Sequence, residues 1–389
     1  MNYTLPTTGK LKKSQAEALA SRLNYCIEEL EACHLDEETG VIHLSLREGT
    51  NLQELEPVLN KLLEAETEIR TLSSRVLLST GTGERGVDHS GDVETVYSFD
   101  GKVRAGLAVT LSDAIDRIFR QFGLEQQAQL RKYSSMIDIE ALNQCNYIET
   151  FPHNIHLVSE IPHQLDQLER VRSESDLNDI ARVSKYALSP AVCFHCYREL
   201  MNSSIESPLV LTALGNCFRH ESAWRVGRHR LNEFHMREIV FLGEAGFVEE
   251  TRTHYIDKVW QLFNDLGFEG RIETASDPFY FSEDASKGQH QMMANMKYEL
   301  IVELPAGQFS IASFNHMGDS LCKKFNISDR SGKSLQSGCT AFGVDRWVYG
   351  LLSRHGIQYS EWPASVRKRL DPYFQDDAKQ SESALLEPV

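Results

Sequence analysis

The sequence predicts an α+β protein, in which antiparallel strands pair through hairpins and helices occupy separate stretches of the chain. The strongest indication is residues 215–243, where short apolar strands around Cys217-Phe218 and around Ile239 to Leu242 flank a polar loop, as in a hairpin. A second indication is the N-terminal stretch, where strand-like alternation and helical spacing follow each other. With 389 residues, 41% of them hydrophobic, the chain can form one large domain and a smaller one.

Residues 1–92 are predicted to form the smaller domain, a small α/β sandwich. Apolar spacing predicts strands and helices in this stretch, with strands at Asn2–Leu5, Val41–Leu46 and Ser74–Ser79 and helices at Ser14–Cys33 and Leu52–Ile69. The glycine-rich residues 81–86 match no phosphate-binding signature, so we expect a linker there. The residues of this domain indicate no particular chemistry.

Residues 93–372 are predicted to form the larger domain. Helical spacing predicts helices at Thr110–Phe122, within residues 164–186 and at Tyr255–Leu266. Ala191–Tyr197 follows Pro190 and is interpreted as a strand, whereas His290 is placed in a polar loop. Residues 373–389 are expected to be a disordered tail, because Asp, Gln, Ser, Glu and Ala dominate them.

The net charge of -16 limits the choice of partners. A protein that binds a nucleic-acid backbone normally presents a basic face, and outside the hairpin loop this chain has only short basic clusters at residues 10–13 and 367–369. We therefore expect no tRNA partner. Because no apolar run approaches the roughly 20 residues of a membrane helix and the N-terminus does not resemble a signal peptide, the sequence predicts a cytoplasmic protein without a membrane partner.

The eight cysteines are scattered and form no dense framework, which favours reduced thiols over disulfides. Cys193 and Cys196 form a Cys-x-x-Cys pair, which occurs both in redox sites and as half of a structural zinc site. Because the sequence has no second pair, we favour one of these cysteines as a metal ligand over a redox role. From residue type alone, Cys193 and Cys339 would be interpreted as buried apolar residues.

The loop of the predicted hairpin concentrates positive charge, and Arg219 lies just before it. Charged side chains on central strands are costly unless a ligand or a metal compensates them. The forked guanidinium of Arg219, with further arginines behind it at Arg225, Arg228 and Arg230, suits a polyphosphate. The alternative interpretation is a solvated hairpin of a larger sheet.

These residues resemble two signature motifs of the class II aminoacyl-tRNA synthetases. Phe218-Arg219-x-Glu221, the basic loop, Arg230 and Glu233-Phe234 resemble the second motif, and residues 230–243 are most similar to the zinc-dependent, methanogen-type seryl branch. Residues 338–346 resemble the third motif, with Asp345 where glutamate is more usual.

From Val93 onward, the chain resembles the amino acid:[carrier protein] ligases, which are similar to seryl synthetases that lack their tRNA-binding domain. Residues 96–100, 131–137 and 147–152 resemble the opening of that family, including the first class II motif. Ser134 and Ser135 stand where that motif usually has proline.

The resemblance implies a class II synthetase-like antiparallel sheet flanked by helices, a homodimer, and ATP-dependent activation of a small α-amino acid as an aminoacyl-adenylate. The acceptor it implies is the phosphopantetheine thiol of a holo carrier protein. Two alternatives stay open, namely an atypical zinc-dependent seryl-tRNA synthetase and a synthetase-like binding module without catalysis.

The resemblance also implies roles for particular residues. ATP, with Mg²⁺, is expected at Arg219, Glu221, Arg230, Leu231, Phe234, Lys297, Ser310, Ser313 and Arg346. Arg219 and Arg346 are the expected catalytic residues, because adenylate formation needs placement and charge neutralisation rather than a protein nucleophile. One Zn²⁺ per chain is expected at Cys193, Glu238 and Cys339, where an open ligand position next to Glu238 would bind the amine of the substrate amino acid.

Overall fold

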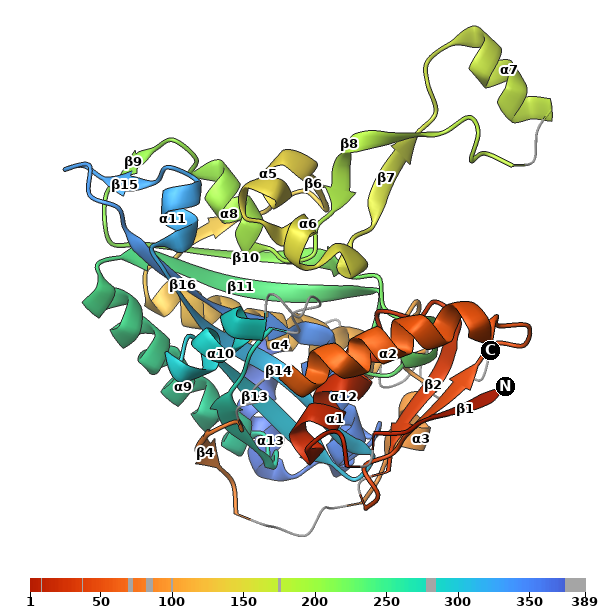
Figure 1. The fold of residues 1–389 in the computed structure, drawn as a ribbon. Coiled ribbons are helices and arrows are strands. Elements are labelled where there is room, and N and C mark those ends of the chain that lie inside the picture. The colour runs from red at the N-terminus through yellow and green to blue at the C-terminus, as the bar shows by residue number, and fades with distance from the viewer. Residues whose placement is uncertain are drawn as a thin grey trace.

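The computed structural model describes residues 1–7, 9–36, 38–68, 73–81, 87–98, 101–173, 176–277 and 285–374. Its main feature is an eight-stranded sheet in the order β4-β12-β13-β14-β16-β11-β10-β5 (Figure 1). Neighbouring strands are antiparallel, except that β5 runs parallel to β10. The strands are β4 (Val76–Ser79), β5 (Gln129–Arg131), β10 (Leu209–Phe218), β11 (Glu233–Gly243), β12 (Gly270–Thr274), β13 (Lys297–Leu304), β14 (Gly307–Gly318) and β16 (Gln336–Gly343). The predicted α+β fold with a large antiparallel sheet is confirmed.

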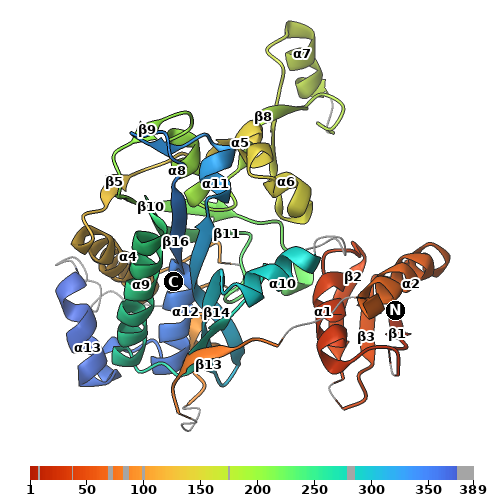
Figure 2. The ribbon, with the colours of Figure 1, turned by 60° about the vertical axis from the view of Figure 1, so that its left-hand side comes forward.

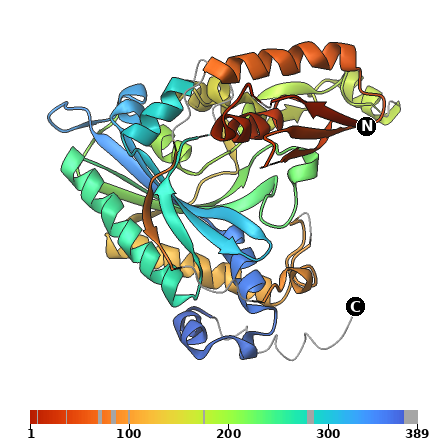
Figure 3. The same cartoon turned by 60° about the horizontal axis from the view of Figure 1, so that its bottom comes forward.

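The sheet lies between two layers of helices. On one face, α4 (Leu107–Glu125), α9 (Ala245–Asp265) and α12 (Val344–His355) form the main core with Ile239 and Phe241 of β11 (Figures 1 and 3). On the other face, α8 (Cys193–Glu199) and α11 (Ser320–Lys324) form a second core with Val240 and Leu242. Alternate residues of β11 thus enter different cores, as the period of a strand requires. Both faces of this strand are therefore buried.

Strands β10 and β11 form the predicted hairpin, and both are longer than their apolar centres indicated. Their register runs from Leu209 opposite Leu242 to Phe218 opposite Glu233. The residues between the strands include the 3-10 helix η2 (Ala223–Arg225) and a tight turn in which the amide of Arg230 donates to the carbonyl of Gly227 at 2.9 Å. We call residues 219–232 the hairpin loop.

The N-terminal unit is a three-stranded sheet, in the order β1-β3-β2, with two helices and its own apolar core (Figure 2). Its elements are β1 (Asn2–Leu5), α1 (Lys13–Leu23), β2 (Leu30–Leu35), β3 (Ile42–Leu46) and α2 (Leu52–Glu68). The single helix predicted over Ser14–Cys33 is wrong, because α1 ends at Leu23. There the side-chain amide of Asn24 donates to the carbonyls of Ala20 and Ser21, at 3.0 and 3.1 Å, and closes the helix.

The strand predicted at Ser74–Ser79 exists as β4, but it belongs to the large sheet, where it pairs with β12. Predicted tail residues from 375 onward and predicted linker residues 82–86 lie outside the described residues. The domain boundaries stay predictions.

Two further expectations about local structure are wrong, and a third is right for only part of its range. Ala191–Tyr197 is not a strand, because Cys193, Cys196 and Tyr197 are buried at helical spacing in α8. His290 lies in helix α10 (Ala285–Met293) rather than in a loop. Of the described residues within 164–186, only those of α7 (Leu165–Ser173) are helical, whereas β8 (Arg182–Leu188) pairs with β6 (Met136–Asp138) and β7 (Leu157–Glu160).

Strands β7 and β8 carry α7 away from the body of the molecule (Figures 1 and 2). The remaining elements are short: α3 (Ser90–Val93), α5 (Ile139–Gln144), α6 (Tyr147–Thr150), η1 (Pro152–Asn154), β9 (Ser204–Ile205), β15 (Ser328–Asp329), η4 (Tyr359–Glu361), α13 (Ala364–Leu370) and η5 (Asp371–Tyr373). Among the described residues, no helix combines the length and the apolar character needed to cross a bilayer.

Gly338 lets β16 pass closely over its neighbours. A Cβ atom at this position would overlap the ring of Phe241 and lie 2.6 Å from the carbonyl oxygen of Asn315, and that oxygen belongs to the backbone and has little freedom to move. Gly246, the second residue of α9, has no atom within 4 Å of the corresponding position.

We therefore predict that Gly338→Ala lowers the free energy of unfolding by about 1 to 3 kcal/mol, the usual cost of overpacking a core. Gly246→Ala is the matched control, and it should keep or slightly raise stability because alanine is favoured over glycine in a helix. Thermal melting of the two purified variants beside the wild type measures the difference. Equal melting temperatures for the two variants would contradict the close packing at Gly338.

Candidate active site

A pocket lies where the hairpin loop meets the start of α12. Its lining includes five of the residues expected to bind ATP, namely Arg219, Glu221, Leu231, Phe234 and Arg346. His229, Gly343 and Asp345 complete it. The second and third sequence motifs therefore meet in space, because β11 pairs directly with β16 and brings the hairpin next to residues 343–346.

Arg219 is placed by the end of the hairpin. Its amide donates to the carbonyl of Asn232 at 2.9 Å, which continues the pairing of β10 and β11 by one step. The guanidinium lies 5.3 Å from the centroid of the Phe234 ring, a cation–π contact, and its Nε donates to the carbonyl of Pro190 at 3.3 Å. The cation and the aromatic ring expected to contact ATP thus lie against each other in the pocket.

Glu221 and Arg230 form an ion pair across the hairpin loop. Nη1 of Arg230 lies 2.9 and 3.0 Å from the two carboxylate oxygens of Glu221, which is 7% exposed. The amide of Glu221 donates to Oδ1 of Asn232 at 2.9 Å. Both ends of the loop are therefore joined directly beside the pocket.

Arg346 lies behind the pocket and is held by backbone carbonyls. Its Nε donates to His229 at 3.0 Å and its Nη1 to Ser310 at 2.8 Å. Burial, with Arg230 and Arg219 nearby, lowers the pKa of Arg346 to about 10. Burial and the surrounding arginines, Arg346 first, likewise lower the pKa of His229 to about 3. Burial is the main cause of both shifts and the neighbouring arginines add to it, so a bound polyanion would stabilise the charged form of Arg346.

The other residues expected to bind ATP lie outside the pocket lining. Nζ of Lys297 forms ion pairs with Asp277 at 2.6 Å and Glu299 at 3.0 Å. Ser310 faces Arg346 with its carbonyl, and Oγ of Ser313 accepts a hydrogen bond from Asn315 at 3.0 Å. Their roles in ATP binding stay predictions.

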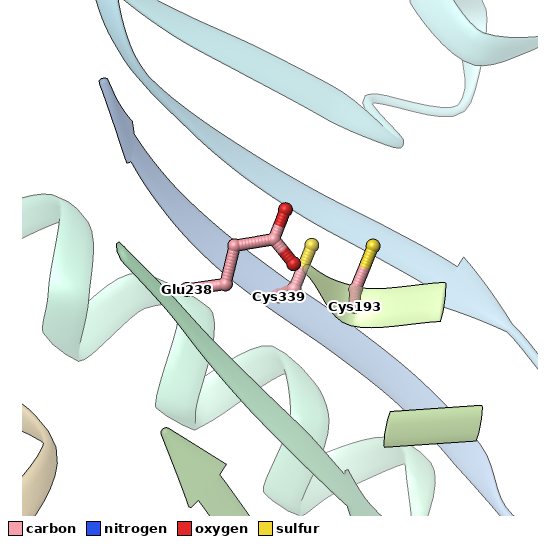
Figure 4. A group of neighbouring side chains, drawn as sticks. All are labelled: Cys193, Glu238 and Cys339. Carbon is pink, nitrogen blue, oxygen red and sulfur yellow. The ribbon is translucent and has the colours of Figure 1, made fainter. Parts of the chain in front are cut away.

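Cys193, Glu238 and Cys339 form a compact buried cluster on the opposite face of the sheet from α12 (Figure 4). One ligand atom from each lies within 4.8 Å of the others. Glu238 comes from β11, Cys339 from β16 and Cys193 from the first residue of α8. Because Glu238 lies opposite Ala341 in the register, it is two residues from Cys339 along the pair and shares its face.

The cluster has the properties of a metal site. Glu238 is 2% exposed, and its Oε2 has no hydrogen-bond partner among the described residues. Burial raises the pKa of Glu238 to about 7, while the contact with Cys339 and burial raise the pKa of the Cys193 thiol. An amide hydrogen of Asn315 points to Sγ of Cys339 at 3.4 Å. Two thiols and a carboxylate are a donor set that zinc accepts, and a divalent cation would compensate this buried acidic group.

Sequence reasoning placed Asp345 in the third motif but predicted no partner for it. Asp345 is 2% exposed and forms an ion pair with Arg104 at 2.6 Å, while it also accepts the amide hydrogen of His235 at 2.5 Å. Arg104 lies outside all the motifs, so only the fold brings it here. His229 belongs to the basic loop, and its ring stacks on that of Phe309 with the ring centroids 4.1 Å apart.

Comparison with known proteins agrees with this geometry. Residues 177–355 match the family model of the tRNA synthetase class II core domain (G, H, P, S and T). The type-2 serine–tRNA ligase of Methanopyrus kandleri is 26% identical over a 285-residue alignment, which covers 67% of this chain and 53% of that protein. The amino acid–[acyl-carrier-protein] ligase 2 of Bradyrhizobium diazoefficiens is 27% identical over 278 residues, covering 68% of this chain and 82% of that protein.

Solved structures show the same fold. The crystal structure of M. kandleri SerRS in complex with A. aeolicus tRNASec has a TM-score of 0.66 and 20% identity, and covers 96% of this chain and 78% of that one. Seryl-tRNA synthetase of Pyrococcus horikoshii complexed with ATP has a TM-score of 0.52 and 16% identity, covering 82% of this chain and 68% of that one.

Residues 177–355 are therefore homologous to the core domain of class II tRNA synthetases, and the chain has the fold of the seryl-tRNA synthetases among the solved structures. It is homologous both to type-2 serine–tRNA ligases, of which it spans about half the length, and to amino acid–[acyl-carrier-protein] ligases.

We predict that freshly purified protein contains about one zinc ion per chain and that Cys339→Ala removes it, because two of the three donors cannot hold the ion alone. Cys196→Ala is the matched control, since Cys196 is a buried cysteine on the same helix as Cys193 but outside the cluster. Metal analysis by mass spectrometry measures both. Full zinc content in Cys339→Ala, or loss of zinc only in Cys196→Ala, would show that the ligands are misassigned.

Proposed function

We propose that this protein activates a small α-amino acid with ATP, as an aminoacyl-adenylate, and transfers it to the phosphopantetheine thiol of a carrier protein. The observation that carries the proposal is that one strand, β11, connects the cationic pocket with the metal-binding cluster. Phe234 lies in the pocket and Glu238 in the cluster, four residues apart, or about 13 Å along a strand. In an aminoacyl-adenylate the adenine and the α-amine lie at opposite ends of the molecule, so one bound molecule could contact Phe234 and a metal at Glu238 together.

The residues of the pocket suit a reaction in which the protein positions the substrates and neutralises their charge. The substrate carboxylate attacks the α-phosphate of MgATP and pyrophosphate leaves, so no protein side chain needs to form a bond. In this scheme Arg219 neutralises the α-phosphate, Arg346 and Arg230 neutralise the outer phosphates, and Phe234 stacks on the adenine. Glu221 would bind the adenine amino group with the carboxylate that Arg230 holds in place. Lys297, Ser310 and Ser313 would complete the nucleotide site from β13 and β14.

The metal cluster suits recognition of the substrate's amine. Bound zinc would offer an open ligand position that selects a free α-amino group. Cys193, Glu238 and Cys339 would hold the metal, and Asn315 would orient Cys339 through its amide. We further propose that the enzyme acts as a homodimer in the cytoplasm.

The second candidate is a zinc-dependent serine–tRNA ligase. Similarity to the two kinds of relatives is nearly equal, at 26% and 27% identity. We favour the carrier protein because the net charge of -16 opposes binding of a polyanionic tRNA. The third candidate, a binding module without catalysis, is disfavoured because Arg219, Glu221 and Arg346 all line the pocket.

We predict that Arg219→Ala and Arg346→Ala each reduce amino-acid-dependent ATP–pyrophosphate exchange by about a hundredfold to a thousandfold, the usual effect of removing one charge-stabilising donor. Arg330→Ala is the control, because Arg330 is an exposed arginine outside the pocket lining. It should exchange at the wild-type rate. A loss below about tenfold in either pocket variant, with the fold intact by circular dichroism, would contradict the assigned role.

The acceptor is tested separately. After the amino acid has been identified by exchange assays with all amino acids, we predict that the labelled amino acid appears on a holo carrier protein as an alkali- and thiol-labile thioester. The apo carrier, which lacks the phosphopantetheine thiol, is the control and should stay unlabelled. Saturable charging of a tRNA, with no thioester on a range of holo carriers, would instead favour the serine–tRNA ligase. Absence of exchange with every amino acid would favour the binding module.

A further inference from the structure

The hairpin loop, which joins β10 and β11 of the large sheet, is in contact with the N-terminal unit. Trp224, in η2, packs against the apolar core of that unit. The contact joins distant parts of the chain, since Tyr25 and Arg225 are 200 residues apart in the sequence.

Two polar contacts lie beside Trp224. The hydroxyl of Ser222 donates to the backbone carbonyl of Asn24. Nη1 of Arg225 donates to the hydroxyl of Tyr25 at 2.9 Å, and the guanidinium lies 5.3 Å from the centroid of the same ring. Arg225 is therefore bound to the N-terminal unit and is absent from the pocket lining, unlike Arg219 and Arg346.

The residues that contact the loop, Asn24 and Tyr25, are themselves held by other contacts. Asn24 and Tyr25 directly follow α1, and the Asn24 side chain closes that helix. The Tyr25 ring also packs on His153, with ring centroids 4.4 Å apart. The next residue, Asn154, accepts the amide hydrogen of His220 at 3.1 Å, so the same contact region supports the loop just before Glu221.

The anchored residues adjoin the nucleotide pocket. Ser222 directly follows Glu221, and Glu221 pairs with Arg230 beside the pocket. A free loop of this length would lose conformational freedom when it binds a nucleotide, and that loss would weaken affinity. Contacts that order the loop beforehand remove part of this loss.

We propose that the N-terminal unit is a positioning module, in which Tyr25 and Asn24 hold residues 222–225 so that the Glu221–Arg230 pair is in place before ATP binds. Tyr25 is thus a positioning residue for the nucleotide site, acting through Arg225. The proposal rests on the proposed adenylation for its kinetic consequence, but its structural part is independent of any activity.

The experiment uses the full-length protein and three variants. Tyr25→Ala removes the ring and the hydroxyl, whereas Tyr25→Phe removes only the hydroxyl. Tyr3→Ala is the control, because Tyr3 is a partly buried tyrosine of the same unit that packs on its core and has no contact with the loop among those described. Hydrogen exchange followed by mass spectrometry measures opening of residues 219–231, and pyrophosphate exchange measures the KM for ATP and for the amino acid.

For Tyr25→Ala, we expect faster hydrogen exchange in residues 219–231 and a KM for ATP raised about five- to tenfold, because only part of the free energy of the lost hydrogen bond and cation–π contact is coupled to ATP binding. The kcat and the KM for the amino acid should stay within about twofold of the wild type, because the metal cluster lies on other elements. Tyr25→Phe should show a smaller effect of the same kind, because it keeps the ring over which Arg225 lies.

Three results would overturn the proposal. They are unchanged hydrogen exchange in residues 219–231 of Tyr25→Ala, an equal change in Tyr3→Ala, and a fall in kcat without a change in the KM for ATP. If the wild type shows no pyrophosphate exchange with any amino acid, the proposed function fails. Hydrogen exchange then still decides whether the N-terminal unit orders the loop.

Discussion

Strand β11 is buried on both faces, and each charged side chain within its buried part therefore needs a partner. Arg237 faces α4 and has one, because its guanidinium pairs with Asp116 and its Nη1 donates to Thr212 at 3.2 Å. Glu238 faces the other core and meets two thiols, with one carboxylate oxygen left without a partner among the described residues. Since burial of an unpaired acidic group is costly, the arrangement is stable only with a proton or a cation at Glu238. Arg237 is therefore part of a structural ion pair, whereas the adjacent Glu238 belongs to a candidate metal site.

The hairpin could be predicted from sequence because strand alternation and the basic loop are both local patterns. The same alternation explains why Glu238 and Cys339 face one core, although only the resemblance to a family nominated the two residues together. Cys193 lies beside Glu238 and Cys339. The sequence placed it on a strand, because a short apolar run of seven residues does not distinguish a strand from a buried helix. No local sequence pattern predicts the contacts of Arg104 with Asp345 and of Tyr25 with Arg225. Only the tertiary fold brings such residues together.

Net charge predicts the behaviour of the whole surface better than that of one site. The chain carries a charge of -16, yet Arg219, Arg346 and the neighbouring Arg230 gather at the pocket, where burial and then the two other arginines lower the pKa of Arg346. An acidic protein can therefore gather several arginines around one small pocket, which Glu221 and Asp345 also line. A nucleotide fits this description better than an extended nucleic acid does.

The position of β4 has a consequence for synthesis on the ribosome. The elements of the N-terminal unit all lie within the first 68 residues, so this unit can complete its core soon after it emerges. Strand β4 cannot, because its partner β12 begins at Gly270, and Thr80 and Gly270 are 190 positions apart. At bacterial-to-eukaryotic elongation rates this interval is about 10 to 40 seconds. During that time β4, which carries Val76 and Leu77, is an apolar strand without a sheet, held beside a unit that has already folded.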